Sequence, residues 1–328
     1  MFRMQIQSKK KCIWYCSAAV SFLLFLLLNL WCDHLVNMQD AQQMAGRWSE
    51  KKDVAQISCF FSSKAEVTED TIQSFEYSLK NVLQEASITE TSENPSARLW
   101  VDAYSADGKI TLVNGRNTLD ANAIGIGGDF FLFHPLKLIT GSYFSGNDLM
   151  QDYCIIDQDA AWQLFGSNDV VGMTVYIGNV PHIVTGVVRR PQGRMEKAAG
   201  LTSTVVYVSY ETLEAYGTSN GINHYEIVMP NPVDEFAYGK VKEGIGIDEK
   251  NVEIVENSRR YSLPNRIKTI LAFGTRSMNG KAIIYPYWEN LARGYEDIIA
   301  LLTVFMLFLL LYPVVTVIWC FVHWWRHK

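Results

Sequence analysis

Residues 154–172, CIIDQDAAWQLFGSNDVVG, read as a short strand, a short helix and a glycine turn. Leu164 and Phe165 lie on the apolar face of the predicted helix, and we expect both to be buried core residues. Gly166 suits the left-handed residue that ends a helix, and Gly172 suits a tight turn into the next strand. The stretch contains no evident catalytic group. We therefore expect this stretch to belong to a rigid module that binds, docks or transmits movement.

Two uncharged apolar runs, residues 13–32 and 298–322, lie near the ends of the 328-residue chain. A helix of about 20 residues spans the roughly 30 Å hydrocarbon core of a membrane, so each run predicts a transmembrane helix. A signal peptide is the alternative for the first run, but its apolar core exceeds the usual length of about 7–15 residues and no small-residue cleavage motif follows it. The sequence therefore predicts two spans.

Basic residues flank both predicted spans and set the expected orientation. By the positive-inside rule, both termini are expected in the cytoplasm and the segment 33–296 outside a plasma membrane. Apart from the six terminal basic residues, 23 Lys and Arg stand against 34 Asp and Glu. This acidity and location disfavour a nucleic-acid partner, whereas membrane lipid is an expected contact of the spans. The terminal basic residues are Arg3, Lys9, Lys10, Lys11, Arg326 and Lys328.

Only two of the six cysteines, Cys59 and Cys154, lie in the predicted outside region. Both lie in apolar, strand-like runs. Two buried free thiols are the favoured interpretation, and one disulfide between them is the alternative. In either case the region is not a disulfide-built scaffold.

The first part of the outside region predicts a small sheet. Residues 54–62 are rich in β-forming side chains, and residues 62–86 have apolar side chains at helical spacing. Residues 97–105 and 109–115 read as a hairpin with Asp107-Gly108 as its turn. This strand-helix-strand-strand order predicts a sheet with helices packed on one face.

The middle of the outside region is strand-rich and includes a predicted hairpin with Gly178-Asn179 as its turn. We expect an α+β fold: a two-lobed extracytoplasmic domain, with a small sheet-plus-helices lobe and an inserted β-rich lobe, between two transmembrane helices. The expected segments are a cytoplasmic tail at 1–12, a transmembrane helix at 13–32, a stalk at 33–50, a first lobe at 51–132 and 223–262, an inserted second lobe at 133–222, a stalk at 263–297, a transmembrane helix at 298–322 and a cytoplasmic tail at 323–328.

No motif in the sequence predicts catalysis or a cofactor. Gly125-Ile126-Gly127-Gly128 is too short for a dinucleotide fingerprint and suits a tight backbone crossing. The six histidines show no metal-ligand spacing, and His134 in its aromatic run favours a structural role. Asp157, Asp159 and Asp169 suit turns and helix starts better than a calcium loop. We therefore expect no catalytic residue, no cofactor, no metal ligand and no ATPase in this chain.

Three pieces of the sequence occur in a recognisable order: GDFFLFHPLKLITGSYFS (128–145), CIIDQDAAWQLFGSNDVVGMTVYIG (154–178) and PHIVTGVVRR (181–190). Together they resemble the MacB-type periplasmic core domain of FtsX-like ABC transporter permeases. The resemblance covers roughly 50–260 and implies a two-lobed α+β ectodomain with the inserted block as its second lobe. The matching positions are Phe131, Leu138, Gly141, Phe144, Ala161, Leu164, Phe165, Gly166, Asp169, Gly172 and Gly186.

The second predicted span carries further signals. Pro313 frees a backbone carbonyl, which favours a neighbouring helix that satisfies it, with a lipid-facing kink as the alternative. Aromatic side chains prefer the membrane interfaces and should fix the depth of the span. Tyr285, Tyr287, Trp288 and Tyr295 are expected at the outer interface, and Trp319, Trp324 and Trp325 at the inner one.

Two functions fit these sequence features. The first is a reduced, two-span, permease-like subunit of an ABC transporter complex, with a separate ABC ATPase subunit and other permease subunits as partners. Family permeases have two further transmembrane helices and a cytoplasmic loop that meets the ATPase, so this form depends on such partners. The cargo could be a peptide, a lipid-linked molecule or an antibiotic. The alternative is a membrane-anchored interaction or signalling protein that senses a ligand or controls a cell-wall hydrolase.

Overall fold

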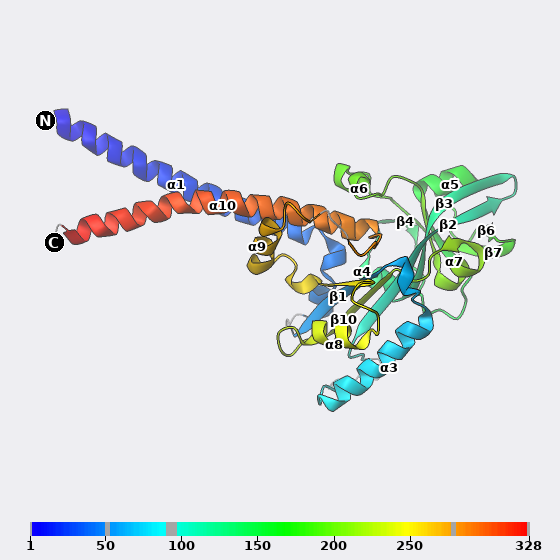
Figure 1. The fold of residues 1–328 in the computed structure, drawn as a ribbon. Coiled ribbons are helices and arrows are strands. Elements are labelled where there is room, and N and C mark those ends of the chain that lie inside the picture. Colours follow the sequence, from blue (N-terminus) through cyan, green and yellow to red (C-terminus); the bar gives the residue numbers. More distant parts are fainter. Residues whose placement is uncertain (1, 50–52, 90–96, 277–279, 327–328) are drawn as a thin grey trace. The chain divides into compact units, whose positions relative to one another are not determined.

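The computed structural model describes residues 2–49, 53–89, 97–276 and 280–326, and it has a mixed α+β fold, as predicted. The chain divides into two compact units. One, here called the ectodomain, comprises residues 40–260 and 277–292, and the other, here called the helical unit, comprises residues 1–39, 261–276 and 293–328. The ectodomain contains an 11-stranded sheet in which the main strand order is β11-β1-β10-β2-β3-β8-β5-β7-β4 (Figure 1).

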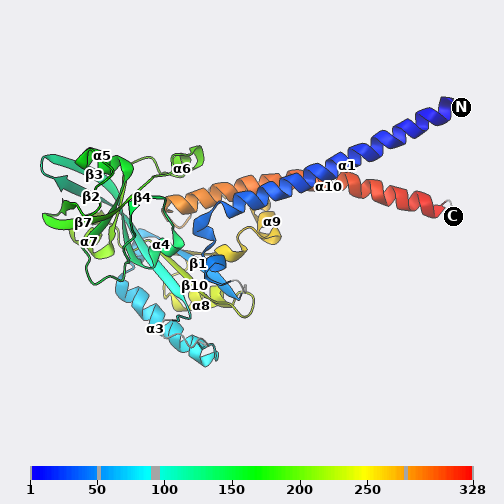
Figure 2. The same cartoon turned by 180° about the vertical axis from the view of Figure 1, so that it is seen from behind.

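One half of the sheet is antiparallel and packs against two helices. Its strands are β1 (Val54–Phe61), β2 (Val101–Asn114), β10 (His224–Pro230) and β11 (Val252–Glu256). Helices α3 (Glu69–Glu85) and α8 (Phe236–Gly244) lie side by side (Figure 2) and contribute apolar side chains to the same core as β1 and β10. The expected helix within 62–86 is confirmed, and its start at Thr68 forms a capping box with Thr71.

The hairpin turn predicted at Asp107-Gly108 is wrong. Strand β2 continues through both residues to Asn114, and the chain reverses at residues 115–116 before β3 (Asn117–Gly128). Asp107 is partly buried, whereas a turn residue is normally exposed. A Cβ on Gly108 would lie 2.4 Å from the backbone oxygen of Thr218. The glycine therefore permits close approach of another strand, β9, and does not make a turn.

The other half of the sheet contains the remaining strands, and β2 and β3 join the two halves. Figure 1 shows β2 and β3 as a long ribbon with α5 and α7 beside them. The predicted lobe boundaries at 133 and 222 stay a prediction. These strands are β4 (Leu138–Gly141), β5 (Tyr153–Asp157), β6 (Thr174–Ile177), β7 (Val180–Val188), β8 (Val205–Ser209) and β9 (Thr218–Ser219), with helices α4 (Phe130–Phe133), α5 (Gln158–Phe165), α6 (Arg194–Ala198) and α7 (Tyr210–Tyr216).

The stretch 154–172 folds as the predicted strand, helix and turn. Asp157 caps α5 by accepting a hydrogen bond from the backbone N–H of Ala160 at 2.8 Å. Gly166 ends the helix with φ 72°, which is the left-handed conformation expected there. Leu164 is buried, but Phe165 is only partly buried against the core. The prediction that Phe165 is a buried core residue is therefore wrong, because the buried face of α5 carries Ala160, Ala161 and Leu164, and Phe165 lies at the edge of that face.

Two further sequence predictions are confirmed. Cys59 and Cys154 are both buried free thiols. Gly178 and Asn179 form the turn between β6 and β7, with φ 57° and 67°. Two successive positive φ values are typical of the two-residue turn that suits a twisted hairpin.

The helical unit contains two helices that are long and apolar enough to cross a membrane. Helix α1 runs from Phe2 to Asn37, and α10 runs from Tyr287 to Arg326. The predicted spans 13–32 and 298–322 lie within them. The short helix α9 (Leu263–Leu271) also belongs to this unit. The remaining short helices are α2 (Met44–Trp48) and the 3-10 helices η1 (Asp40–Gln42), η2 (Ser63–Ala65) and η3 (Asn257–Arg259), all in the ectodomain.

Candidate functional site

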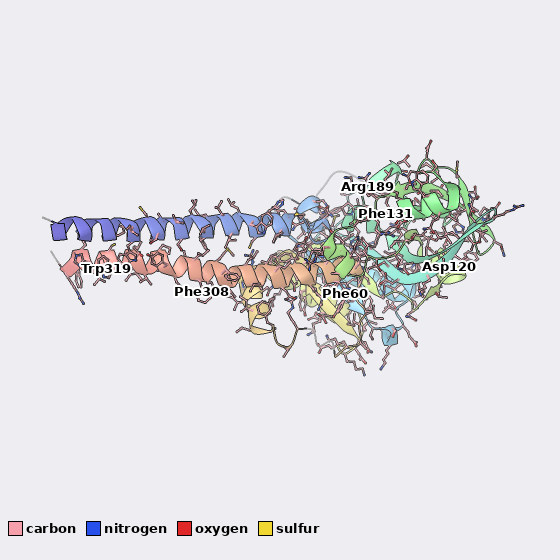
Figure 3. All side chains as sticks on the ribbon, turned by 90° about the horizontal axis from the view of Figure 1, so that it is seen from above. Phe60, Asp120, Phe131, Arg189, Phe308 and Trp319 are labelled. Atoms are coloured by element: carbon pink, nitrogen blue, oxygen red, sulfur yellow. The ribbon has the colours of Figure 1, made fainter. Side chains whose placement is uncertain are left out.

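The central strand β10 has two different buried faces. Tyr225 and Ile227 point into the apolar core with α3, while His224 and Glu226 point to the opposite face. The register places Ser58 of β1 opposite Glu226. This second face is therefore polar but buried. Helix α4 contributes Phe130 to the cluster beside this face, and the first turn of α10 contributes Trp288. Figure 3 labels Phe60 and Phe131 among the packed side chains of the ectodomain.

Three ionisable side chains meet on this face. The Nε2 atom of His134 lies 2.8 Å from Oε2 of Glu226, and Nε2 of His224 lies 3.5 Å from Oε1 of the same carboxylate. Their side chains are at most 3% exposed. Ser58 donates a hydrogen bond of 2.5 Å to Oε1 of Glu226, and Ser105 lies 3.3 Å from Nδ1 of His224. We call His134, His224 and Glu226 the buried triad.

Hydrogen bonds connect the triad to the start of α10. Asn257 of η3 donates to Ser58 at 2.6 Å, and Arg260 donates to Asn257 at 3.3 Å. Arg260 then makes two hydrogen bonds, of 2.6 and 2.7 Å, to the carboxylate of Glu289 in the first turn of α10. Such a bidentate Arg–carboxylate pair fixes both position and orientation. We call the path from Glu289 through Arg260, Asn257 and Ser58 to Glu226 the α10 network.

Both ends of the Arg260–Glu289 pair are buried, at 3% and 1% side-chain exposure. Arg260 also donates to Gln42 of η1 at 3.1 Å, so the segment that follows α1 is held in the same network. Removing one member of a buried ion pair leaves an uncompensated charge, which typically costs about 3–5 kcal/mol. The first turn of α10 is therefore strongly attached to the ectodomain.

Trp288 also anchors the first turn of α10 and is only 4% exposed. Its ring centre lies 4.3 Å from that of His134 and 5.3 Å from that of His224. Tyr285 lies just before the helix and donates a hydrogen bond to Glu253 of β11. Trp288 therefore belongs to the ectodomain core, and its predicted role at the outer membrane interface is wrong. Tyr287 also packs against this core, whereas Tyr295 packs within the helical unit, and its predicted place at the outer interface stays a prediction.

The electrostatics of the triad follow from burial and mutual attraction. Burial would raise the pKa of Glu226, but the two nearby imidazoles together hold the pKa of this carboxyl well below its usual range. Burial lowers the pKa of His134, and the attraction of Glu226 only partly opposes this. The triad thus combines a carboxylate with an imidazole that burial favours in its neutral form.

A separate carboxyl lies on the opposite face of the sheet. Tyr225 donates a hydrogen bond of 2.9 Å to Oδ2 of Asp102. Burial, together with the neighbouring Glu76, raises the pKa of Asp102 to about 8. Asp102 also lines a pocket of about 380 Å³ beside α3, with Lys80 and Trp100 among its walls.

The helical unit supplies a hydrogen-bond donor to the backbone carbonyl that Pro313 frees. Proline lacks the N–H that would bond to the carbonyl four residues earlier, at Leu309. The Oγ atom of Ser21 in α1 donates a hydrogen bond of 2.7 Å to that Leu309 oxygen. Ser17 and Tyr312 form a second hydrogen bond of 2.7 Å between the helices. The neighbouring helix that Pro313 predicted is therefore α1 of the same chain.

Neither the triad nor the α10 network was predicted from the sequence. The spacing of His224 and Glu226, two residues apart in a strand, places both side chains on one face and is the signal that could have been used. His134 is 90 residues away in the sequence, as its number shows, and only the fold brings it to the strand. The expected absence of metal ligands rested on sequence spacing alone, and the structure brings three potential ligands together.

The sequence matches the MacB-like periplasmic core domain over residues 38–254, which is more than half of the chain. The chain belongs to this family. The Macrolide export ATP-binding/permease protein MacB of Pasteurella multocida is 31% identical over 98 residues, 29% of this chain and 14% of that protein. MacB of Neisseria gonorrhoeae is 36% identical over 80 residues, 24% of this chain and 12% of that protein. The matched stretches thus span a small part of these relatives.

Two solved structures are similar to this chain at low identity. The periplasmic region of MacB from Actinobacillus actinomycetemcomitans gives a TM-score of 0.43 at 18% identity and covers 65% of this chain and 92% of that chain. The extracellular domain of the noncanonic ABC-type transporter YknZ from Gram-positive bacteria gives a TM-score of 0.38 at 19% identity and covers 61% and 99%. The family membership and the two apolar terminal helices fit a two-pass membrane protein.

Proposed function

We propose that this protein is a permease-like membrane subunit of an ABC transporter complex and that it transmits ATP-driven helix movement to its MacB-like ectodomain. A separate ABC ATPase subunit and other permease subunits are the proposed partners. The chain itself performs no catalysis. Both termini lie in the cytoplasm in this proposal, and the segment 33–296 lies outside the plasma membrane.

The observation that carries the proposal is the continuity of α10. Its first turn is held in the ectodomain by Trp288 and by the Glu289–Arg260 pair, and the same helix continues through the apolar segment to Arg326. Figure 3 labels Phe308 and Trp319 along this apolar segment. A continuous helix with a rigidly attached first turn transfers a displacement along its axis with little loss. Family membership supports the transporter context.

The first test is purification of the full-length protein in mild detergent, with co-purifying proteins identified by mass spectrometry. An ABC ATPase together with a membrane permease is the expected result. Capture of a cell-wall hydrolase or a sensor kinase, with no ATPase, would favour the membrane-anchored interaction or signalling protein instead.

The second test separates movement transfer from assembly. We expect the double substitution Arg260→Met and Glu289→Met to fold and assemble, because an apolar pair often replaces a buried ion pair at little cost in stability. We expect ATP hydrolysis by the purified complex to become uncoupled from transport, because the orienting hydrogen bonds to α10 are lost. The control is the double substitution Lys240→Met and Glu243→Met, which replaces an ion pair on the surface. Full transport by the Arg260 and Glu289 double variant would show that the α10 network is not needed to transfer movement.

A further inference from the structure

The buried triad has unsatisfied polar atoms at its centre. Within the described residues, Nε2 of His134, Nε2 of His224 and Oε2 of Glu226 are buried atoms without a hydrogen-bond partner. The 2.8 Å distance between His134 and Glu226 is short enough for a hydrogen bond. The contact nevertheless leaves both atoms without a hydrogen bond of acceptable geometry. Direct contacts alone therefore leave the three atoms unsatisfied.

Leaving such atoms unsatisfied is costly. Each buried polar atom without a partner costs about 1–3 kcal/mol, and more when it is charged. The surrounding groups are aromatic: the ring of Phe60 stacks on that of His224 at 5.0 Å, and Phe130 lies 4.6 Å from His134. They offer no alternative acceptor to the imidazoles. A group that binds all three atoms at once would remove the whole cost.

The three atoms are arranged as ligands of one ion. One potential ligand atom from each residue lies within 4.8 Å of the other two. Ligands on tetrahedral zinc lie about 3.3 Å apart, since each bond to the ion is about 2.0 Å. The observed 2.8 and 3.5 Å contacts bracket this value.

The outer residues of the cluster also fit a metal site. Ligating side chains are normally oriented by a second hydrogen bond. Ser58 supplies it to Glu226, and Ser105 lies within hydrogen-bond distance of the remaining nitrogen of His224. Trp288 covers the triad, and its Nε1 hydrogen is buried and has no acceptor among the described residues. A water molecule on the ion would provide that acceptor.

We propose that His134, His224 and Glu226 bind one Zn²⁺ ion that joins the end of α4 to strand β10. Two imidazoles and one carboxylate suit zinc, whereas Ca²⁺ and Mg²⁺ prefer an all-oxygen set. Three protein ligands leave a fourth position for water. The role of the ion is structural, because all three ligand residues are buried. This inference is independent of the transporter function.

The test begins with the full-length protein, purified in mild detergent from cells supplied with zinc. We expect one zinc ion per chain by elemental mass spectrometry, retained after dialysis against EDTA. Removal of the ion by chelator under denaturing conditions should lower the thermal midpoint of the refolded protein, and added Zn²⁺ should restore it. Refolding with Co²⁺ should give the visible absorption of a four-coordinate ion. Zinc below one ion per chain, at the level of a metal-free control protein, together with no effect of Zn²⁺ on the midpoint, would overturn the proposal.

Variants assign the ligands. We expect Glu226→Gln and His134→Gln each to lose the bound zinc and to melt at the same temperature with and without added Zn²⁺. His182→Gln is the matched control, because His182 is equally buried but contacts Val180 and Thr212 through its two ring nitrogens. That variant should keep the ion. If either triad variant fails to fold, the metal content of the unaltered protein still decides. Zinc retained by a folded Glu226→Gln or His134→Gln protein would contradict the assignment.

Discussion

At the residue scale, Asp102 shows how one buried carboxyl makes stability depend on pH. The pKa of Asp102 is raised to about 8, mainly by burial and then by Glu76. In the unfolded chain this carboxyl has a pKa of about 3.9. Between these values the folded protein keeps a proton that the unfolded chain has released. Its contribution to stability is therefore present at low pH and is lost as the pH rises from about 4 to about 8.

This gives the first prediction. Asp102→Asn replaces the protonated acid by a neutral amide that can still accept the Tyr225 hydrogen bond. The variant should become increasingly more stable than the parent from pH 5 to pH 8, by up to about 1 kcal/mol per pH unit. The measurement is the thermal or urea midpoint at each pH. Asp120→Asn removes an exposed carboxylate on β3 and is the control for lost charge. A constant difference between Asp102→Asn and parent would mean that Asp102 is ionised throughout this range.

At the element scale, the α1–α10 pair repairs its own proline defect. Ser21→Ala should leave the Leu309 carbonyl without a donor, whereas Pro313→Ala should restore the intrahelical N–H. In the Pro313→Ala background, Ser21→Ala should therefore cost less than in the parent. Side-chain hydrogen bonds between membrane helices are worth about 0.6 kcal/mol on average and up to about 1.7. The coupling energy of the double-mutant cycle should be in that range.

The measurement is the unfolding free energy of the full-length protein in mixed detergent micelles. Ser17→Ala is the matched control, because Ser17 contacts the side-chain hydroxyl of Tyr312 and not the freed carbonyl. Its cost should be the same with proline or alanine at position 313. Equal costs for Ser21→Ala in the two backgrounds would show that the Ser21 hydroxyl does not compensate for the N–H that Pro313 lacks.

At the scale of the whole molecule, local patterns in the sequence predicted local structure well. The spans, the helix α5, the turn at Gly178-Asn179 and the α+β class each depend on residues close in sequence. The error at Asp107-Gly108 arose because a contact with distant β9 overrode a local turn signal. Contacts between residues distant in the sequence also form the triad and the α10 network, so neither was predicted. Their members come from β1, α4, β10, η3 and α10, and no short window of sequence contains them.

The topology of the whole chain gives the last prediction. Lys109 is an exposed residue of β2 in the ectodomain, so Lys109→Cys should react with a membrane-impermeant thiol reagent on intact cells. Gln7→Cys lies in the basic segment before the first apolar run, and the positive-inside rule places it in the cytoplasm, where it should react only after lysis. The parent sets the background, which should be low because Cys59 and Cys154 are buried. Labelling of both variants on intact cells would place the N-terminus outside. A protein with two spans and an outside domain must have both tails in the cytoplasm. That result would therefore contradict the proposed two-span topology.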